Sequence, residues 1–276
     1  MRPAQLIARA AAYLERHGVD SPRATAEILL MHVLGTDRVG LYTRVERLDA
    51  RQAREFGRAL CQRCAGTPVQ HLTGEQAFHR LRLEVRPGVF VPRPETEVLV
   101  EVALREIREV EAPVVVDVGT GTGAIALAIK RERPDAAVFA TDVAPEAVEL
   151  ARVNAARLGL EVDVRQGDLL APLPDDLRGW VDLVVSNPPY VPEEEYEDLP
   201  AEVRADPREA LIGGPEVYER LAAEATRWLR DGGVLAVEIH AAAGEAVRSI
   251  LRRSFADVRV HRDLAGRDRV LTARRP

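Results

Sequence analysis

The stretch VVVDVGTGTGA, residues 114–124, decides the fold of this chain. Its first residues form a short β-branched run, which is typical of a strand buried on both faces of a sheet. Three glycines follow at every second position, and an apolar helix over residues 124–131 comes directly after them. A strand, a glycine loop and a helix in this order predict the first βα unit of a doubly wound α/β sheet with mostly parallel strands.

The residues after this unit continue the alternation of strands and helices. The apolar periodicity predicts a helix over 95–109, strands over 137–141, 161–165, 181–186 and 234–239, helices over 145–158 and 245–254, and terminal strands near 258–261 and 269–273.

The N-terminal part has a different period. Apolar residues over 1–65 recur at helical spacing, and Ser21-Pro22 is typical of an N-cap followed by a helix start. Residues 78–91 alternate as strands do, with Pro87-Gly88 as the expected turn. The patterns predict a helical domain over 1–75, a β-hairpin linker over 76–92 and an α/β domain over 93–276.

Composition sets the class of protein. The chain has 276 residues, of which 46% are hydrophobic and 30% charged, and no apolar run is long enough to cross a membrane. Two cysteines give no disulfide framework, so we expect a reducing cytoplasm. The net charge of −6 argues against a protein that coats nucleic acid, although residues 1–85 are basic and the remainder is acidic. The basic part is either a docking face for a partner or a solvated helical surface.

The glycine loop is a candidate nucleoside site, formed by Gly119, Thr120, Gly121, Thr122 and Gly123. A P-loop is excluded because Ala124 stands where that motif needs lysine. A methyl donor, a dinucleotide and a purely structural turn remain open. Asp117, near the end of the strand before the loop, favours S-adenosylmethionine. The ammonium group of that donor can use carboxylate acceptors, whereas a pyrophosphate cannot.

Two further acids follow the next strands. Asp142 ends the strand after the glycine loop, where a carboxylate can accept hydrogen bonds from both hydroxyls of a ribose. Asp168 follows the third strand and can accept from an adenine amino group, with Leu169 packing on the base.

The motif Asn187-Pro188-Pro189-Tyr190 ends the strand over 181–186 and is the candidate catalytic motif. It presents an amide oxygen, a main-chain carbonyl and an aromatic ring together, because the prolines fix φ and remove two backbone donors. Two acceptors can hold a planar NH₂ group while its nitrogen attacks a sulfonium methyl group. The alternative interpretation of this motif is an ordinary turn after a strand, with no catalytic role.

The chain resembles the bacterial release-factor glutamine N5-methyltransferases, the PrmC/HemK family. The resemblance is carried by residues 68–74 (PVQHLTG), 90–97 (FVPRPETE), 117–123, 187–190 and 265–270 (AGRDRV). The chain departs from the family pattern at His71, at His240 and over 215–219, outside the loop and the catalytic motif. The resemblance implies a seven-strand Rossmann-like S-adenosylmethionine-dependent methyltransferase domain, a small all-helical N-terminal domain that docks the substrate and a β-hairpin linker.

The resemblance also implies a substrate, which is the glutamine in the Gly-Gly-Gln motif of class I peptide chain release factors. Asn187 and the Pro188 carbonyl would hold its amide, and the glycine loop, Asp142, Leu169 and Asn187 match donor-binding positions. A further segment would close over donor and glutamine; it comprises Phe90, Arg93, Pro94, Glu95 and Thr96. We expect a monomer that uses no metal and acts on no membrane or nucleic acid.

Two other functions stay open from the residues. The catalytic motif is shared with adenine-N6 and guanine-N2 methyltransferases of nucleic acids, but the α/β domain is acidic and no separate basic recognition module is present in the sequence. A catalytically idle nucleoside-binding scaffold is the third hypothesis. Cys61 and Cys64 form a C-x-x-C, but no second cysteine pair exists and the pair closes a helix, so we expect neither a zinc nor a redox site.

Overall fold

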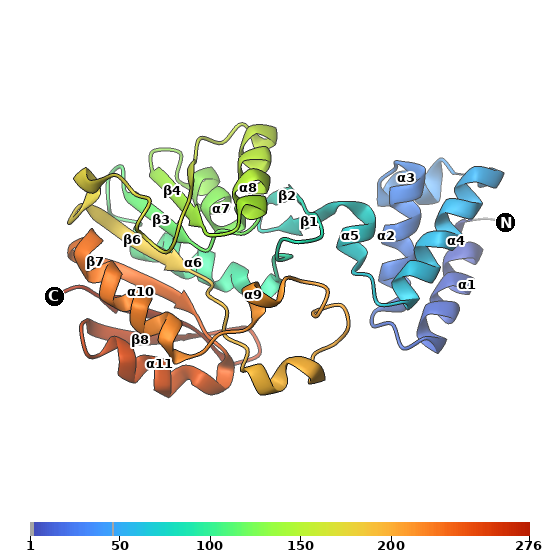
Figure 1. Ribbon diagram of the computed structural model, residues 1–276. Coiled ribbons are helices and arrows are strands. Elements are labelled where there is room, and N and C mark those ends of the chain that lie inside the picture. Colours follow the sequence, from blue (N-terminus) through green and yellow to red (C-terminus); the bar gives the residue numbers. More distant parts are fainter. Residues whose placement is uncertain (1–2, 46) are drawn as a thin grey trace. The chain divides into compact units, whose positions relative to one another are not determined.

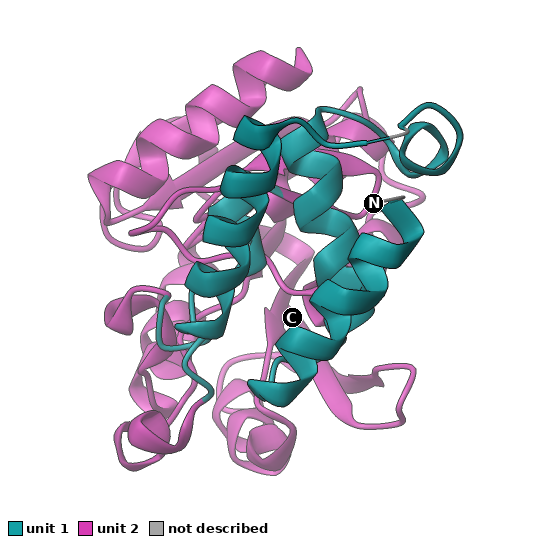
Figure 2. Ribbon diagram, turned by 90° about the vertical axis from the view of Figure 1, so that its right-hand side faces the viewer, with its two compact units in different colours: residues 1–75, 200–205 teal, residues 76–199, 206–276 magenta. Residues whose placement is uncertain are grey.

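The structure is a computed structural model that describes residues 3–45 and 47–276. Residues 1, 2 and 46, which fall in the predicted helical domain, lie outside the described residues. The chain divides into two compact units (Figure 2): Met1–Glu75 with Pro200–Ala205, and Gln76–Leu199 with Asp206–Pro276. We call them the helical unit and the sheet unit.

The described residues of the helical unit form five helices, α1 (Pro3–Arg16), α2 (Pro22–Leu34), α3 (Arg38–Thr43), α4 (Ala50–Cys64) and α5 (Val69–Thr73). Its core is formed by one apolar face from each long helix, with Leu14 and Leu29 fully buried. The predicted helix start at Pro22 is confirmed, but Ser21 is left-handed (φ 48°) and makes no side-chain cap. Helix α4 does have a side-chain cap at its start, because Asp49 forms a capping box with Gln52.

The segment Pro200–Ala205 joins the helical unit through α4. The Arg63 side chain is 9% exposed and forms an ion pair with Glu202. Gly66, which follows the end of α4 and has φ 97°, lies beside Ala201 of this segment. Residues 200–205 therefore belong to the helical unit, although the chain before and after them belongs to the sheet unit.

The sheet unit is built on seven strands in the order β5-β4-β3-β6-β7-β9-β8. They are β3 (Val114–Val118), β4 (Ala137–Asp142), β5 (Asp163–Gln166), β6 (Val181–Ser186), β7 (Leu229–Glu238), β8 (Ala256–Arg262) and β9 (Asp268–Arg274). β9 runs antiparallel to both of its neighbours, β7 and β8, and all other neighbouring strands pair in parallel. The predicted doubly wound α/β fold with seven strands is confirmed.

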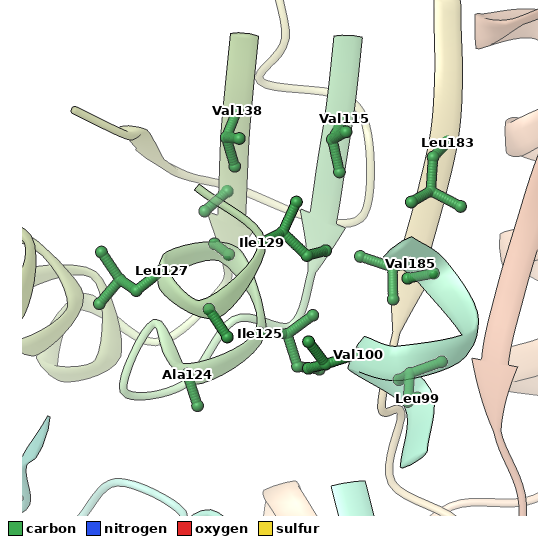
Figure 3. Close-up of a cluster of buried hydrophobic side chains, with 14 of the residues drawn as sticks. Leu99, Val100, Val115, Ala124, Ile125, Leu127, Ile129, Val138, Leu183 and Val185 are labelled. Atoms are coloured by element: carbon green, nitrogen blue, oxygen red, sulfur yellow. The ribbon is translucent and has the colours of Figure 1, made fainter. Parts of the chain in front are cut away.

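Helices cover both faces of this sheet (Figure 1). One face carries α6 (Glu97–Glu106), α7 (Ala124–Glu132) and α8 (Pro145–Leu158), and the other carries α10 (Pro215–Trp228) and α11 (Gly244–Leu251). In Figure 3, Val100 of α6 and Ile125 of α7 lie against the same face as Val115 and Val185. Because both faces are buried, the central strands β3 and β6 are nearly continuous apolar runs.

Three elements differ from the sequence prediction. The hairpin strands β1 (Glu75–Phe78) and β2 (Leu81–Glu84) turn at His79-Arg80, so Pro87-Gly88 lies beyond the hairpin. His79 takes φ 51°, a conformation that the sequence does not announce because the residue is not glycine. The helix expected over 95–109 begins with a 3₁₀ turn at Pro94–Thr96, and α10 was not predicted at all. No helix in the described ranges has the length and apolar character needed to cross a bilayer.

Candidate active site

The two candidate motifs follow neighbouring strands of the sheet. β3 leads into the glycine loop, and β6, which pairs with β3 in parallel, leads into Asn187. The chain moves from β3 through β4 to β5 on one side and returns to β6 on the other. The carboxyl ends of β3 and β6 therefore flank the point where strand order reverses, which is where doubly wound sheets bind ligands.

The glycine loop folds back on the neighbouring strand. Gly119, Gly121 and Gly123 all have positive φ, at 72°, 56° and 84°. A side chain on Gly123 would meet Leu127 and Ala151 at 3.0 and 3.3 Å, so helix α7 can begin here only without one. The loop thus presents bare backbone at the end of β3.

Asp117, the strand acid that favours S-adenosylmethionine in the sequence analysis, contacts both the glycine loop and helix α7. Its carboxylate is fully buried, and Oδ2 accepts hydrogen bonds from Thr120 Oγ1 (2.6 Å) and from the main-chain N–H of Ala126 (3.1 Å) in the first turn of α7. Burial raises the pKa of Asp117 to about 7, although both of these donors lower it. Oδ1 is buried without a hydrogen-bond partner among the described residues. The acid therefore fixes the loop and keeps one acceptor open.

Asp142 lies beside the loop at the end of β4. Its Oδ2 accepts from the N–H of Gly121 at 2.8 Å and its Oδ1 from the N–H of Ala144 at 3.0 Å. Burial raises its pKa, and the backbone donors lower it. Each oxygen keeps a free lone pair, so the carboxylate can accept from a pair of vicinal hydroxyls.

Asp168 and Leu169 follow β5 as predicted, in different environments. Leu169 is left-handed (φ 47°), and its carbonyl accepts from Thr141 Oγ1 at 2.7 Å, which ties this turn to β4. Asp168 is exposed and forms an ion pair with Arg220 of α10 at 2.5 Å. That partner was missed because α10 was not predicted.

Asn187 is held in one orientation by Thr96. Its Nδ2 donates to Thr96 Oγ1 at 3.2 Å, and its Oδ1 is buried with no partner among the described residues. Thr96 itself is 3% exposed. A buried acceptor without a donor is costly, and this oxygen is free to accept a hydrogen bond.

Tyr190 is anchored by a residue that the sequence analysis missed. Its hydroxyl donates to Oε1 of Glu238, the last residue of β7, at 3.2 Å. Burial raises the pKa of Tyr190 and raises that of Glu238 to about 7. The hydroxyl of Tyr218 donates to the main-chain oxygen of Glu238 at 3.0 Å. The ring after the two prolines is thus fixed by a buried carboxyl group.

The predicted closing segment is fixed at Asp206, a second missed residue. The Asp206 side chain is fully buried, pairs with Arg93, and accepts from the N–H of Val91 at 3.0 Å. The Arg93 guanidinium carbon lies 5.4 Å from the centre of the Phe90 ring. Asp206 therefore holds the segment that leads to Thr96.

The chain after the catalytic motif returns to it. Val191 pairs with Ile212 in an isolated parallel bridge, which closes the excursion between them. Gly213 lies so near that an added Cβ would come within 2.1 Å of the Pro189 carbonyl oxygen. Only glycine allows the backbone at residue 213 to come this near to the carbonyl group of Pro189.

The arrangement fits the methyl donor expected from the sequence. Bare loop backbone, a carboxylate with two free lone pairs on Asp142, and the open acceptor on Asp117 match a glycine-loop contact, a ribose diol and an ammonium group. The open oxygen of Asn187 matches a planar NH₂ group next to it.

Comparisons with known proteins agree with this geometry. Residues 5–74 match the family model of the PrmC N-terminal domain, and residues 80–266 match that of the methyltransferase small domain. A release factor glutamine methyltransferase of Moorella thermoacetica is 42% identical over 280 residues, covering 98% of each chain. That of Mycolicibacterium smegmatis is 46% identical over 275 residues, covering 98% of this chain and 96% of the relative.

A solved methyltransferase structure from Pyrococcus furiosus shares the fold, with a TM-score of 0.51 and 18% identity over 82% of this chain and 98% of that one. The matched models and the full-length relatives go further than the fold. The chain belongs to the family of release factor glutamine methyltransferases.

Proposed function

We propose that this chain transfers the methyl group of S-adenosylmethionine to the side-chain amide nitrogen (N5) of the glutamine in the Gly-Gly-Gln motif of class I peptide chain release factors. Membership of the family supports the proposal. The single observation that carries it is Asn187, whose Nδ2 is committed to Thr96 while its buried Oδ1 awaits a donor.

The proposed donor site uses the loop and two turns. Gly119, Thr120, Gly121, Thr122 and Gly123 would hold the amino-acid part, and Asp142 would accept from the ribose hydroxyls. Leu169 would pack on the adenine, and Asp168 would accept from its amino group while it keeps Arg220. When bound, S-adenosylmethionine supplies an electrophilic sulfonium methyl group.

The chain's own residues orient the nucleophile. An amide nitrogen is a poor nucleophile because its lone pair is delocalised into the carbonyl group. Asn187 Oδ1 and the Pro188 carbonyl oxygen would accept its two N–H bonds, which fixes its plane and favours the positive charge that builds on nitrogen. As the N–C bond forms, the C–S bond breaks, and the acidified nitrogen then loses one proton to water. Pro189 and Tyr190 would shape the face against which the amide lies.

The segment over 90–96 would cover the substrate glutamine. Phe90, Arg93, Pro94, Glu95 and Thr96 lie on one continuous stretch that Asp206 anchors. Excluding water there strengthens the hydrogen bonds to the amide, because they act in a medium of low dielectric constant.

The helical unit would dock the release factor. Residues 1–85 carry the basic excess of the chain, and Arg54 and Arg58 are exposed on α4. Electrostatic docking of this kind is screened by salt, so KM for the release factor should rise with ionic strength while kcat changes little. We further propose that the chain acts as a monomer in the cytoplasm.

The experiment is mass spectrometry of a release factor incubated with the enzyme and S-adenosylmethionine. We expect one added methyl group on the tip glutamine, and none on a release factor whose tip glutamine is replaced by glutamate. Asn187→Ala should keep the donor affinity within a few-fold and lower turnover by roughly 100-fold or more, because it removes a contact made mainly during reaction. Methyl incorporation into ribosomal RNA or DNA, with none in the release factor, would overturn the proposal.

A further inference from the structure

Glu238 is a buried carboxyl group beside the catalytic motif that the proposed methyl transfer does not yet use. It is 1% exposed and ends β7, which pairs with β6 up to Ser186 and Val237. Glu238 therefore stands one residue further along its strand, next to Asn187. Burying a carboxyl group is costly unless it has partners, so its partners indicate its purpose.

These partners come from the site itself. Oε1 accepts from the hydroxyl of Tyr190 at 3.2 Å, and the hydroxyl of Thr96 lies close enough to lower the pKa of Glu238. Oε2 has no hydrogen-bond partner among the described residues. Arg269 is nearby, but its guanidinium group pairs with Asp263 at 3.3 Å. Glu238 thus faces two hydroxyl groups of the candidate active site.

The direction of these contacts has a consequence for Asn187. An ionised carboxylate has only acceptor atoms, so the hydroxyl groups that face it turn their protons toward it. Thr96 Oγ1 then presents lone pairs, and Asn187 Nδ2 donates to it at 3.2 Å. With its nitrogen held in this way, the amide of Asn187 turns its oxygen into the site.

We propose that Glu238 is a positioning residue for the methyl transfer: it fixes the polarity of the hydrogen bonds behind Asn187 and Tyr190, so that the site receives an NH₂ donor. The inference rests on the proposed function and deepens it, because it explains why an amide is selected and a carboxylate is not. A carboxylate substrate would place an acceptor against the buried Asn187 Oδ1, and neither oxygen would have a proton to share.

Titration of Glu238 supports the arrangement. Its pKa is raised to about 7 by burial, and Thr96, Arg269 and Tyr190 lower it from the value that burial alone would give. The groups that face it are Tyr190, Thr96, Arg269 and Glu95, with Tyr218 on its main-chain oxygen. Once protonated, the carboxyl group becomes a donor and releases one hydroxyl to turn toward Asn187. We therefore expect kcat to fall below about pH 7.

The test compares the wild type with Glu238→Gln, Thr96→Val and Thr96→Ser in single-turnover methylation of a release factor between pH 6 and 9. Glu238→Gln should lower the rate by about 10- to 100-fold, as expected for the loss of a hydrogen bond to a charged group. KM for the release factor and the affinity for S-adenosylhomocysteine should stay within about two-fold, because the contact acts on the reacting group. The acid limb near pH 7 should disappear.

The Thr96 pair keeps the test informative if Glu238→Gln fails to fold. Thr96→Val should lose as much as Glu238→Gln, and Thr96→Ser should restore the lost rate. The double variant Glu238→Gln/Thr96→Val should be no slower than the slower single variant, because both act through one chain of hydrogen bonds. Tyr218→Phe is the matched control: it removes a buried hydroxyl from the main-chain oxygen of Glu238 and should leave the acid limb in place.

A second readout does not depend on activity. Thermal unfolding should show the wild type losing stability relative to Glu238→Gln as pH rises through 7, because a raised folded-state pKa favours the protonated form. An active wild type together with a Glu238→Gln variant of unchanged rate and pH profile would overturn this inference alone. Serine failing to restore Thr96→Val would do the same. A wild type that methylates no release factor would overturn the proposed function and this inference with it.

Discussion

Replacing Asp206 by alanine should remove the anchor of the segment over 90–96. The carboxylate is fully buried and is shared by the Val91 N–H and the Arg93 guanidinium group. A buried N–H left without an acceptor costs about 1–3 kcal/mol. Arg93 is 27% exposed, so solvent screens its charge once the partner is gone. Loss of the ion pair between Arg93 and Asp206 therefore adds only about 1 kcal/mol to the destabilisation. We expect the free energy of unfolding to fall by about 3 kcal/mol.

Urea denaturation followed by tryptophan fluorescence measures this change in the right unit. Both tryptophans of the chain, Trp180 and Trp228, lie in the sheet unit, and Trp228 is 2% exposed. Asp206→Asn keeps an acceptor for the Val91 N–H and should lose only about 1 kcal/mol. Asp231→Ala is the control, because that side chain is 89% exposed, and it should change stability by less than about 0.5 kcal/mol. If Asp206→Ala is no more destabilising than this control, the anchor does not exist.

Three further predictions concern the glycine loop and the catalytic motif. Asp142→Ala should weaken binding of S-adenosylmethionine by about 1.5–3 kcal/mol, measured by calorimetry, and an unchanged affinity would refute the ribose assignment. The pKa of Asp117 is raised to about 7, so its contribution to stability is complete below about pH 4 and is lost as pH rises through 7; Asp117→Asn should therefore gain stability over the wild type between pH 5 and 8 in urea titrations. Gly213→Ala would bring Cβ within 2.1 Å of the Pro189 carbonyl oxygen, so it should lower turnover at least about ten-fold with the donor affinity kept; full activity would show that the approach is not needed.

Glycine and proline residues at the ends of strands and helices made much of the sheet unit predictable from the sequence. Glycines after Val118 and prolines after Asn187 mark the ends of two strands, and the β-branched runs before them leave little choice of structure. Parallel strands meet at one edge, so the sequence alone brings the two motifs together. The helix over 145–158 was predicted at its observed bounds for the same reason, since Pro145 and Gly159 enclose it.

The contacts that were missed depend on residues far apart in the sequence. Glu238 meets Tyr190, and Asp206 meets Val91, across gaps that no local pattern encodes. Helix α10 is different, because Gly214-Pro215 and the apolar spacing that follows were a readable start signal. The hairpin turn at His79 could not be read, because a left-handed histidine leaves no mark in composition.

The crossing of the chain between the two units bears on how such enzymes can be dissected. A fragment cut after Glu75 would leave Pro200–Ala205 behind, although this segment belongs to the helical unit (Figure 2). Arg63 would then keep its mostly buried guanidinium group and lose the counter-charge of Glu202. Modules separated or exchanged at that boundary would start with an unbalanced charge inside, so a graft of residues 200–205, or neutralisation of Arg63, belongs in any scheme that transplants the helices.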